Sequence, residues 1–92
     1  MNDKENILKI VKIYKDFLVG SDITSHQADL NSVELTELQK FEHLLYMLDK
    51  IIEQDDIEKS NRWIGFIQGV LWSLDVFSIE DLRGHVLTIQ LK

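Results

Sequence analysis

The segment RWIGFIQGVLWSLDVFSIEDLRGH, from Arg62 to His85, constrains the fold more than any other part of the chain. If the first half of this segment is helical, its apolar side chains point in almost every direction around the helix. Two glycines also fall within that half. A helix that is apolar all round is either deeply buried or shared with another chain. The chain has only 92 residues, and domains of this size often gain stability by oligomerising. The segment therefore favours a homo-oligomer formed through this helix.

The composition narrows the possible classes of function. The chain has no cysteine, which excludes disulfides, thiolate catalysis and cysteine-type zinc sites and is typical of a reducing compartment. The first 19 residues carry four lysines among their apolar positions. We therefore expect neither a signal peptide nor a membrane span, and a cytoplasmic location. Residues 20–61 hold three lysines against ten acidic residues, so nucleic acid is not an expected partner, because this surface would repel phosphates.

Apolar periodicity predicts one all-α domain over residues 1–92, built from four helices. The first helix is expected from about Asp3 to Val19, with Gly20 as a left-handed cap at its end. A polar, aperiodic loop follows over residues 20–30. We expect the third and fourth helices to form a C-terminal hairpin, with the second helix bridging that hairpin to the first.

The start of the second helix is predicted from a capping pattern. Asn31 fits the N-cap position, and Glu34 supplies the reciprocal acid three residues later. Leu30 and Leu35 lie on either side of this cap, where two apolar side chains can pack together across it. The pattern places the first turn of the second helix directly after Asn31.

Similar patterns predict the third and fourth helices. Asp55 with Glu58 resembles a capping box, and the third helix is expected from about Asp56 to Asp75. Ser78 with Asp81 predicts the cap of the fourth helix. Its C-terminal VLTIQL segment could be helix or strand; we favour helix, because the sequence offers no other strand with which it could pair.

The third helix has two distinct sides. One side is apolar and predicted to face the core; it contains Trp63, Ile64, Ile67, Val70, Leu71 and Leu74. Gly65, Gly69 and Ser73 recur every fourth residue on another side and predict a smooth groove that a second backbone could approach. Each glycine costs about 1 kcal/mol relative to alanine inside a helix, so two of them indicate a compensating contact. With Trp72, whose direction is nearly opposite to that of Trp63, these three residues form the predicted oligomer interface.

No catalytic or metal signature accompanies these features. His26, His43 and His85 are isolated in the sequence, without the paired spacing of a zinc or di-iron site. We interpret them as structural or solvated histidines. We therefore predict no catalytic residue, no bound metal and no cofactor, and we expect the protein not to be an enzyme.

An acidic cluster surrounds the turn between the second and third helices. It contains Asp49, Glu53, Asp55, Asp56 and Glu58. Calcium binding is disfavoured because the EF-hand order of ligands is absent, and mimicry of DNA needs acids spread over a wider face. The simplest interpretation is a solvated, solubilising surface. Asp49, Glu53, Asp55 and Asp56, together with the 20–30 loop, are nevertheless the surfaces left for a protein target.

The segment from Asn61 to His85 resembles a C-terminal signature found in small, mostly uncharacterised proteins of tailed bacteriophages. In that signature a helix with the pattern RWxGFxQGxLW is followed by a short turn and an acidic helix. The matching residues are Arg62, Trp63, Gly65, Phe66, Gln68, Gly69, Leu71, Trp72, Glu80, Leu82 and Arg83. The resemblance implies a phage-encoded accessory protein acting in the bacterial cytoplasm, and it implies no enzymatic activity.

Two functions are compatible with these observations. The first is a non-enzymatic, oligomeric interaction protein that binds a bacterial host or defence protein and modulates or inhibits it. The second is an oligomeric protein that binds a nucleotide or metabolite in a pocket formed by Arg62, Trp63 and Trp72 at a subunit boundary, because arginine beside tryptophan suits an anionic, stackable ligand.

Overall fold

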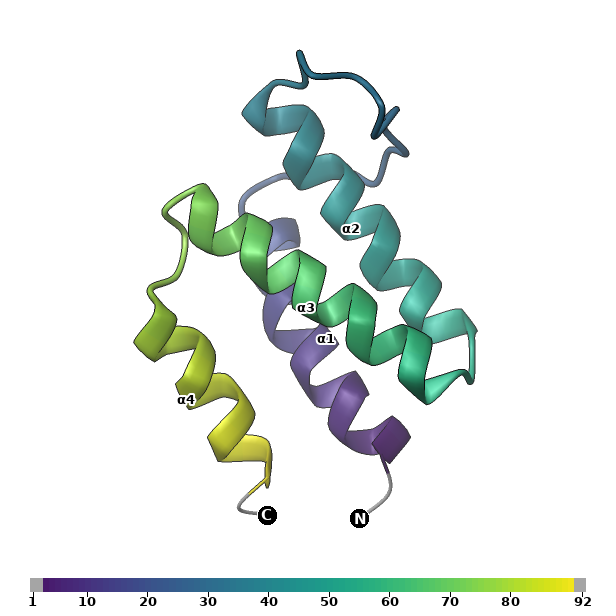
Figure 1. The fold of residues 1–92 in the computed structure, drawn as a ribbon, viewed down its shortest axis with the longest axis vertical. Helices are drawn as coiled ribbons and strands as arrows, with labels where there is room; N and C mark the ends of the chain where they lie inside the picture. Colours follow the sequence, from purple (N-terminus) through teal and green to yellow (C-terminus); the bar gives the residue numbers. More distant parts are fainter. Residues whose placement is uncertain (1–2, 91–92) are drawn as a thin grey trace.

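The computed structural model describes the backbone of residues 3–90 and the side chains of residues 3–85. These residues form four α-helices and no strand: α1 (Asp3–Gly20), α2 (Glu37–Glu53), α3 (Ile57–Ser73) and α4 (Ile79–Gln90) (Figure 1). The prediction of an all-α chain with four helices is confirmed. α1 contacts each of the other three helices, and α2 contacts both α1 and α3.

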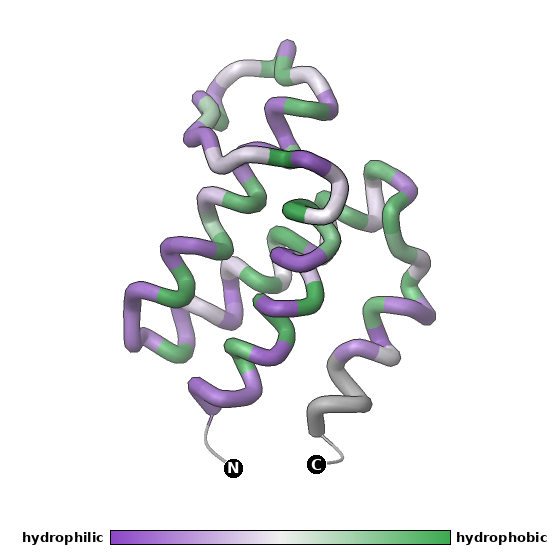
Figure 2. The backbone as a smooth tube through the Cα atoms, turned by 180° about the vertical axis from the view of Figure 1, so that it is seen from behind, coloured by the Kyte–Doolittle hydropathy of each residue, from purple (hydrophilic) through white to green (hydrophobic). Residues whose placement is uncertain are grey.

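The helices share one apolar core. Figure 2 shows hydrophobic and hydrophilic positions alternating along them, as expected when one side of each helix is buried. The buried apolar side chains are Ile7, Val11, Tyr14, Leu18, Leu44, Leu45, Met47, Leu48, Ile51, Ile64, Ile67, Leu71 and Leu82. None of the helices within residues 3–90 combines the length and the apolar character needed to cross a membrane.

The end of α1 differs from the prediction. Gly20 is still helical, and the left-handed residue is Asp22, with φ 63°. The N–H of Asp22 donates to the carbonyl of Val19 at 3.0 Å, and the N–H of Ile23 donates to that of Leu18 at 3.0 Å. This pair of bonds is the Schellman pattern, which places the left-handed residue two positions after Gly20.

The start of α2 was predicted wrongly. Its N-cap is Thr36, whose Oγ1 accepts from the N–H of Gln39 at 3.1 Å, while the Gln39 side chain accepts from the N–H of Thr36 at 2.8 Å. Asn31 instead lies in a turn, where its N–H donates to Oδ1 of Asp29 at 3.0 Å. The sequence contains two successive capping patterns, over residues 31–34 and 36–39, and the turn at Asp29 leaves the second one, at Thr36, to start the helix.

The third and fourth helices begin close to their predicted positions. Asp56, and not Asp55, caps α3, because Oδ1 of Asp56 accepts from the N–H of Lys59 at 3.0 Å. Ser78 and Asp81 cap α4 as predicted, since each side chain accepts from the other's N–H at 3.0 Å. α4 is helical to Gln90, which confirms helix for that part of the VLTIQL segment; its last residue lies outside the described residues.

Candidate interaction surface

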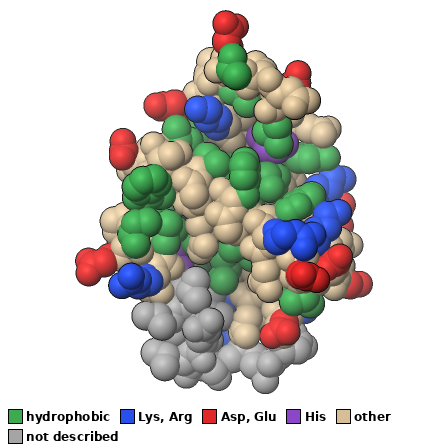
Figure 3. Space-filling model, in the orientation of Figure 1, with side chains coloured by type: hydrophobic (Ala, Val, Ile, Leu, Met, Phe, Trp, Pro, Cys, Tyr) green, Lys and Arg blue, Asp and Glu red, His purple; other side chains and the backbone are tan. Residues whose placement is uncertain are grey.

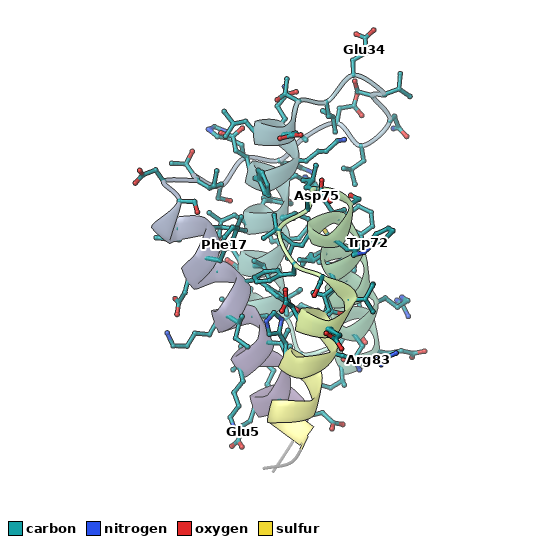
Figure 4. All side chains as sticks on the ribbon, turned by 90° about the vertical axis from the view of Figure 1, so that its left-hand side faces the viewer. Glu5, Phe17, Glu34, Trp72, Asp75 and Arg83 are labelled. Atoms are coloured by element: carbon teal, nitrogen blue, oxygen red, sulfur yellow. The ribbon has the colours of Figure 1, made fainter. Side chains whose placement is uncertain are left out.

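One side of α3 faces solvent and carries several residues that are unusual on a surface. This exposed α3 face consists of Arg62, Gly65, Phe66, Gly69, Trp72 and Ser73. Phe66 and Trp72 are 47% and 51% exposed. Figure 4 shows Trp72 projecting outward from α3. The structure therefore brings the four residues of the predicted interface, Gly65, Gly69, Trp72 and Ser73, together on one surface.

The two glycines on this face have no packing role within the chain. A Cβ atom added at Gly65 or Gly69 would meet no other atom within 4 Å, apart from neighbouring residues and the backbone of α3 itself. Neither glycine has a positive φ angle that would exclude another residue. Each costs about 1 kcal/mol relative to alanine in a helix. No contact among the described residues offsets that cost.

The residues of the predicted ligand pocket do not meet within one chain. Trp63 and Trp72 are nine residues apart on α3, which places them on opposite sides of the helix. Trp63 is partly buried against the core, and Nζ of Lys59 lies 5.0 Å from its ring centroid. Trp72 lines a hollow of about 310 Å³ with Asp75, Phe77 and Ser78. A pocket that contains Trp63 and Trp72 together would therefore need two subunits.

The acidic residues around the α2–α3 turn have partners inside the chain. Asp49 pairs with Lys15 at 2.9 Å, and Glu53 pairs with Lys50 at 3.4 Å. Asp55 lies 3.6 Å from Lys4. Figure 3 shows acidic and basic side chains interspersed on the visible face. These pairs lower the local charge that a basic partner would meet.

Lys4 also binds the end of α2 directly. Its Nζ donates to the carbonyls of Ile51 and Ile52 at 3.3 Å each, and to the carbonyl of Gln54. A cation at this position favours the negative end of the helix dipole and satisfies carbonyls that have no partner within α2. Lys4 therefore has a structural role at the acidic turn, which local sequence patterns could not predict because the contact spans about half of the chain.

A buried polar network joins α1, α3 and α4. Nε2 of Gln68 donates to the hydroxyl of Tyr14 at 3.0 Å, and this hydroxyl lies 3.1 Å from Nδ1 of His85. Tyr14 is fully buried, and burial raises its pKa above the usual 10.0, while the hydrogen bond from Gln68 acts in the opposite direction. The network joins the three helices through hydrogen bonds.

A loop over residues 23–35 covers part of α2. The N–H of His26 donates to the carbonyl of Glu42 at 3.3 Å, and the N–H of Ala28 donates to Nδ1 of His43 at 3.0 Å. An open hollow of about 580 Å³ lies between this loop and α2, and His26, Asp29 and Glu42 are among its lining residues. Within the described residues, no cluster of three or more histidine, aspartate or glutamate side chains could hold a metal ion.

Comparison with known proteins assigns the chain to no family. No protein-family model matches the chain, and no curated protein or solved structure is significantly similar to it.

Proposed function

We propose that this chain is a non-enzymatic interaction protein that pairs with a second copy of itself through the exposed α3 face. The observation that carries the proposal is the space beside Gly65 and Gly69, where a Cβ would meet no other atom within 4 Å. Glycine permits the closest approach of two backbones, and the exposed aromatic rings of Phe66 and Trp72 supply the apolar area that an interface core needs.

An antiparallel arrangement of two α3 helices fits the positions of these residues. If the two-fold axis passes level with Ile67, Gly65 of one copy lies level with Gly69 of the other, since each is two residues from the axis. The same axis brings Arg62 of one copy level with Trp72 of the other. Arg62 has a side chain that is 66% exposed and makes only a 3.8 Å contact with Glu58. Its guanidinium is therefore available to stack on the indole ring of the other copy.

Cysteine cross-linking tests both the pairing and its direction, because the natural chain contains no cysteine. We expect a mixture of the Gly65→Cys and Gly69→Cys proteins to form a mixed disulfide dimer under mild oxidation, with each variant alone cross-linking much less. A disulfide needs Cα atoms within about 7 Å. Efficient cross-linking of each variant alone would indicate parallel helices, and no cross-link in any sample would contradict pairing through this face.

Mass measurement provides a second test. Light scattering should give more than one chain per particle for the parent protein, and Gly69→Leu should shift the mass toward the monomer, because a branched side chain would hold the backbones apart. Gly84→Leu is the matched control, since Gly84 is a helical glycine with the same open surroundings on α4. An equal shift in both variants, or a monomeric parent, would contradict the proposal.

We further propose that the protein binds a bacterial host or defence protein and modulates it, as the resemblance of residues 61–85 to phage proteins implies. Three of the proposed partner residues form ion pairs. Among these three, the side chains of Glu53 and Asp55 are the most exposed, at 66% and 98%. Reversing both to lysine should reduce capture of a partner from bacterial lysate without changing the helical circular dichroism spectrum. Unchanged capture would leave the acidic turn with only a solubilising role.

A further inference from the structure

The side chain of His43 is hydrogen-bonded to the loop that covers it. The side chain lies on α2 and is 6% exposed. Its Nδ1 atom accepts a hydrogen bond from the backbone N–H of Ala28 at 3.0 Å. Because Nδ1 accepts this hydrogen bond, the neutral ring must carry its own hydrogen on Nε2. This bond and the one from His26 to the Glu42 carbonyl hold residues 26–28 against α2.

The residues that follow this held segment border an apolar seam between α2 and α3. Leu30 and Leu35 of the loop border a small hollow of about 30 Å³ together with Phe66 and Val70 of α3. The solvent-accessible lining of this hollow is entirely apolar. These two leucines were predicted to pack across a helix cap at Asn31; they instead border this hollow.

We propose that His43 is an acid-sensitive latch, which holds residues 26–28 on α2 while its ring is neutral and releases them when the ring is protonated. Protonation places a hydrogen on Nδ1, so that two donors, Nδ1–H and the N–H of Ala28, face each other across 3.0 Å. The hydrogen bond is then lost and replaced by repulsion. A buried cation also lacks compensation, because no carboxylate among the described residues forms an ion pair with His43.

The charged and titratable groups around His43 set the direction of this response. On α2, Lys40 borders the same hollow and opposes a second positive charge, while the ring of Tyr46 lies 5.6 Å from the imidazole. On the other side of the loop, His26, Asp29 and Glu42 line the open polar hollow.

α3 presents only apolar side chains to the hollow beside His43, Phe66 and Val70. Burial lowers the pKa of His43 below its usual 6.5. The latch is therefore closed at neutral pH, and it opens as the pH falls through the lowered pKa of His43.

Nuclear magnetic resonance of the full chain tests the latch. At about pH 7.5, the ring nitrogens of His43 should show the tautomer with hydrogen on Nε2. On acidification to about pH 5, hydrogen exchange at Ala28, corrected for its intrinsic pH dependence, should become about tenfold faster, as expected for the loss of one hydrogen bond. The change should follow the titration of His43, while the amides of α1 keep their protection.

Two variants separate the latch from general acid destabilisation. His43→Asn keeps an acceptor oxygen near the position of Nδ1 but does not titrate, so Ala28 should stay protected at both pH values. His26→Gln is the control and should leave the transition unchanged. A neutral ring with hydrogen on Nδ1, a pH-independent exchange rate at Ala28, or an unchanged transition in His43→Asn would each overturn the proposal.

Discussion

The hydroxyl of Tyr14 links three helices. It connects α1 with Gln68 on α3 and with His85 on α4. Tyr14 recurs with Ile7, Val11 and Leu18 at steps of three and four residues, so helical periodicity accounts for its place in the core. It could not predict the partners of the hydroxyl, because Gln68 and His85 lie 54 and 71 residues away in the sequence. Burial can be read from local periodicity, whereas a long-range polar contact depends on how the helices pack.

We expect Tyr14→Phe to lower the free energy of unfolding by about 1–3 kcal/mol, since the side chains of Gln68 and His85 lose a buried partner. Tyr46→Phe is a suitable control, because Tyr46 is only partly buried and contacts neighbouring groups through its ring. Denaturant unfolding at neutral pH measures both. Equal losses in the two variants would mean that the Tyr14 hydroxyl contributes little to stability.

Burial of Tyr14 also predicts a loss of stability in alkali. The pKa of Tyr14 is raised in the folded protein above the usual 10.0, so the unfolded chain releases this proton first. The resulting stabilisation is present below about pH 10 and is lost as the pH rises through the folded pKa. Between these two values the parent should lose stability more steeply than Tyr14→Phe in denaturant unfolding. Parallel curves for the two proteins would contradict the burial argument.

At the scale of the helices, local patterns predicted the starts of α3 and α4 to within one residue but not that of α2. Asn31 and Thr36 both begin a sequence that fits a capping box, and the sequence alone could not rank them. The structure selects Thr36, because residues 26–28 pack along α2 and residues 29–32 then form a turn around Asp29 before the helix begins. The choice between two locally equivalent caps therefore depends on where the loop packs.

The two caps should differ in their energetic effect. Thr36→Ala is expected to lower the free energy of unfolding by about 1 kcal/mol, because it removes the acceptor for the N–H of Gln39. Asn31→Ala should cost no more than a few tenths, since its side chain caps no helix. Reversible denaturant unfolding distinguishes the two changes, and a larger loss at Asn31 would contradict the observed start of α2.

α1 and α3 end in the same way, and both ends use an aspartate where glycine is the common residue. Asp22 and Asp75 have φ angles of 63° and 61°. At the second site the N–H of Val76 donates to the carbonyl of Leu71 at 2.9 Å, as Ile23 does at the first. The sequence pointed to Gly20 because glycine is favoured in this conformation, but the hydrogen bonds place the left-handed residue two positions later.

Asp22→Gly and Asp75→Gly should each raise the free energy of unfolding by about 0.5 kcal/mol. Glycine adopts a positive φ without strain, and the change removes a negative charge from the negative end of a helix dipole. Asp16→Gly is the control and should lower the free energy of unfolding. Asp16 lies inside α1, where glycine is unfavourable, and the change would also remove its ion pair with Lys12. Destabilisation at both helix ends would contradict the assigned Schellman geometry.

At the scale of the whole molecule, the sequence correctly placed Gly65, Gly69 and Trp72 away from the core, because a helical period assigns directions without any tertiary information. The charge of the α2–α3 turn could not be judged in the same way. Asp49 and Asp55 looked unpaired in the sequence, and their partners, Lys15 and Lys4, come from α1. Surface charge depends on which helices become neighbours, whereas the exposed α3 face depends on one helix alone.

Gly69→Ala should therefore change stability in opposite directions at low and high protein concentration. In dilute solution the free energy of unfolding of the variant should be about 0.5–1 kcal/mol higher than that of the parent, because alanine is the better helix former and its Cβ meets open space. At high concentration the parent gains stability by pairing, through mass action, and the variant should gain less because its methyl group separates the two backbones. Gly84→Ala, at a helical glycine away from the exposed α3 face, should be stabilised at every concentration. Denaturant unfolding over a wide concentration range gives all of these values, and a concentration-independent gain for Gly69→Ala would show that this glycine does not serve self-association.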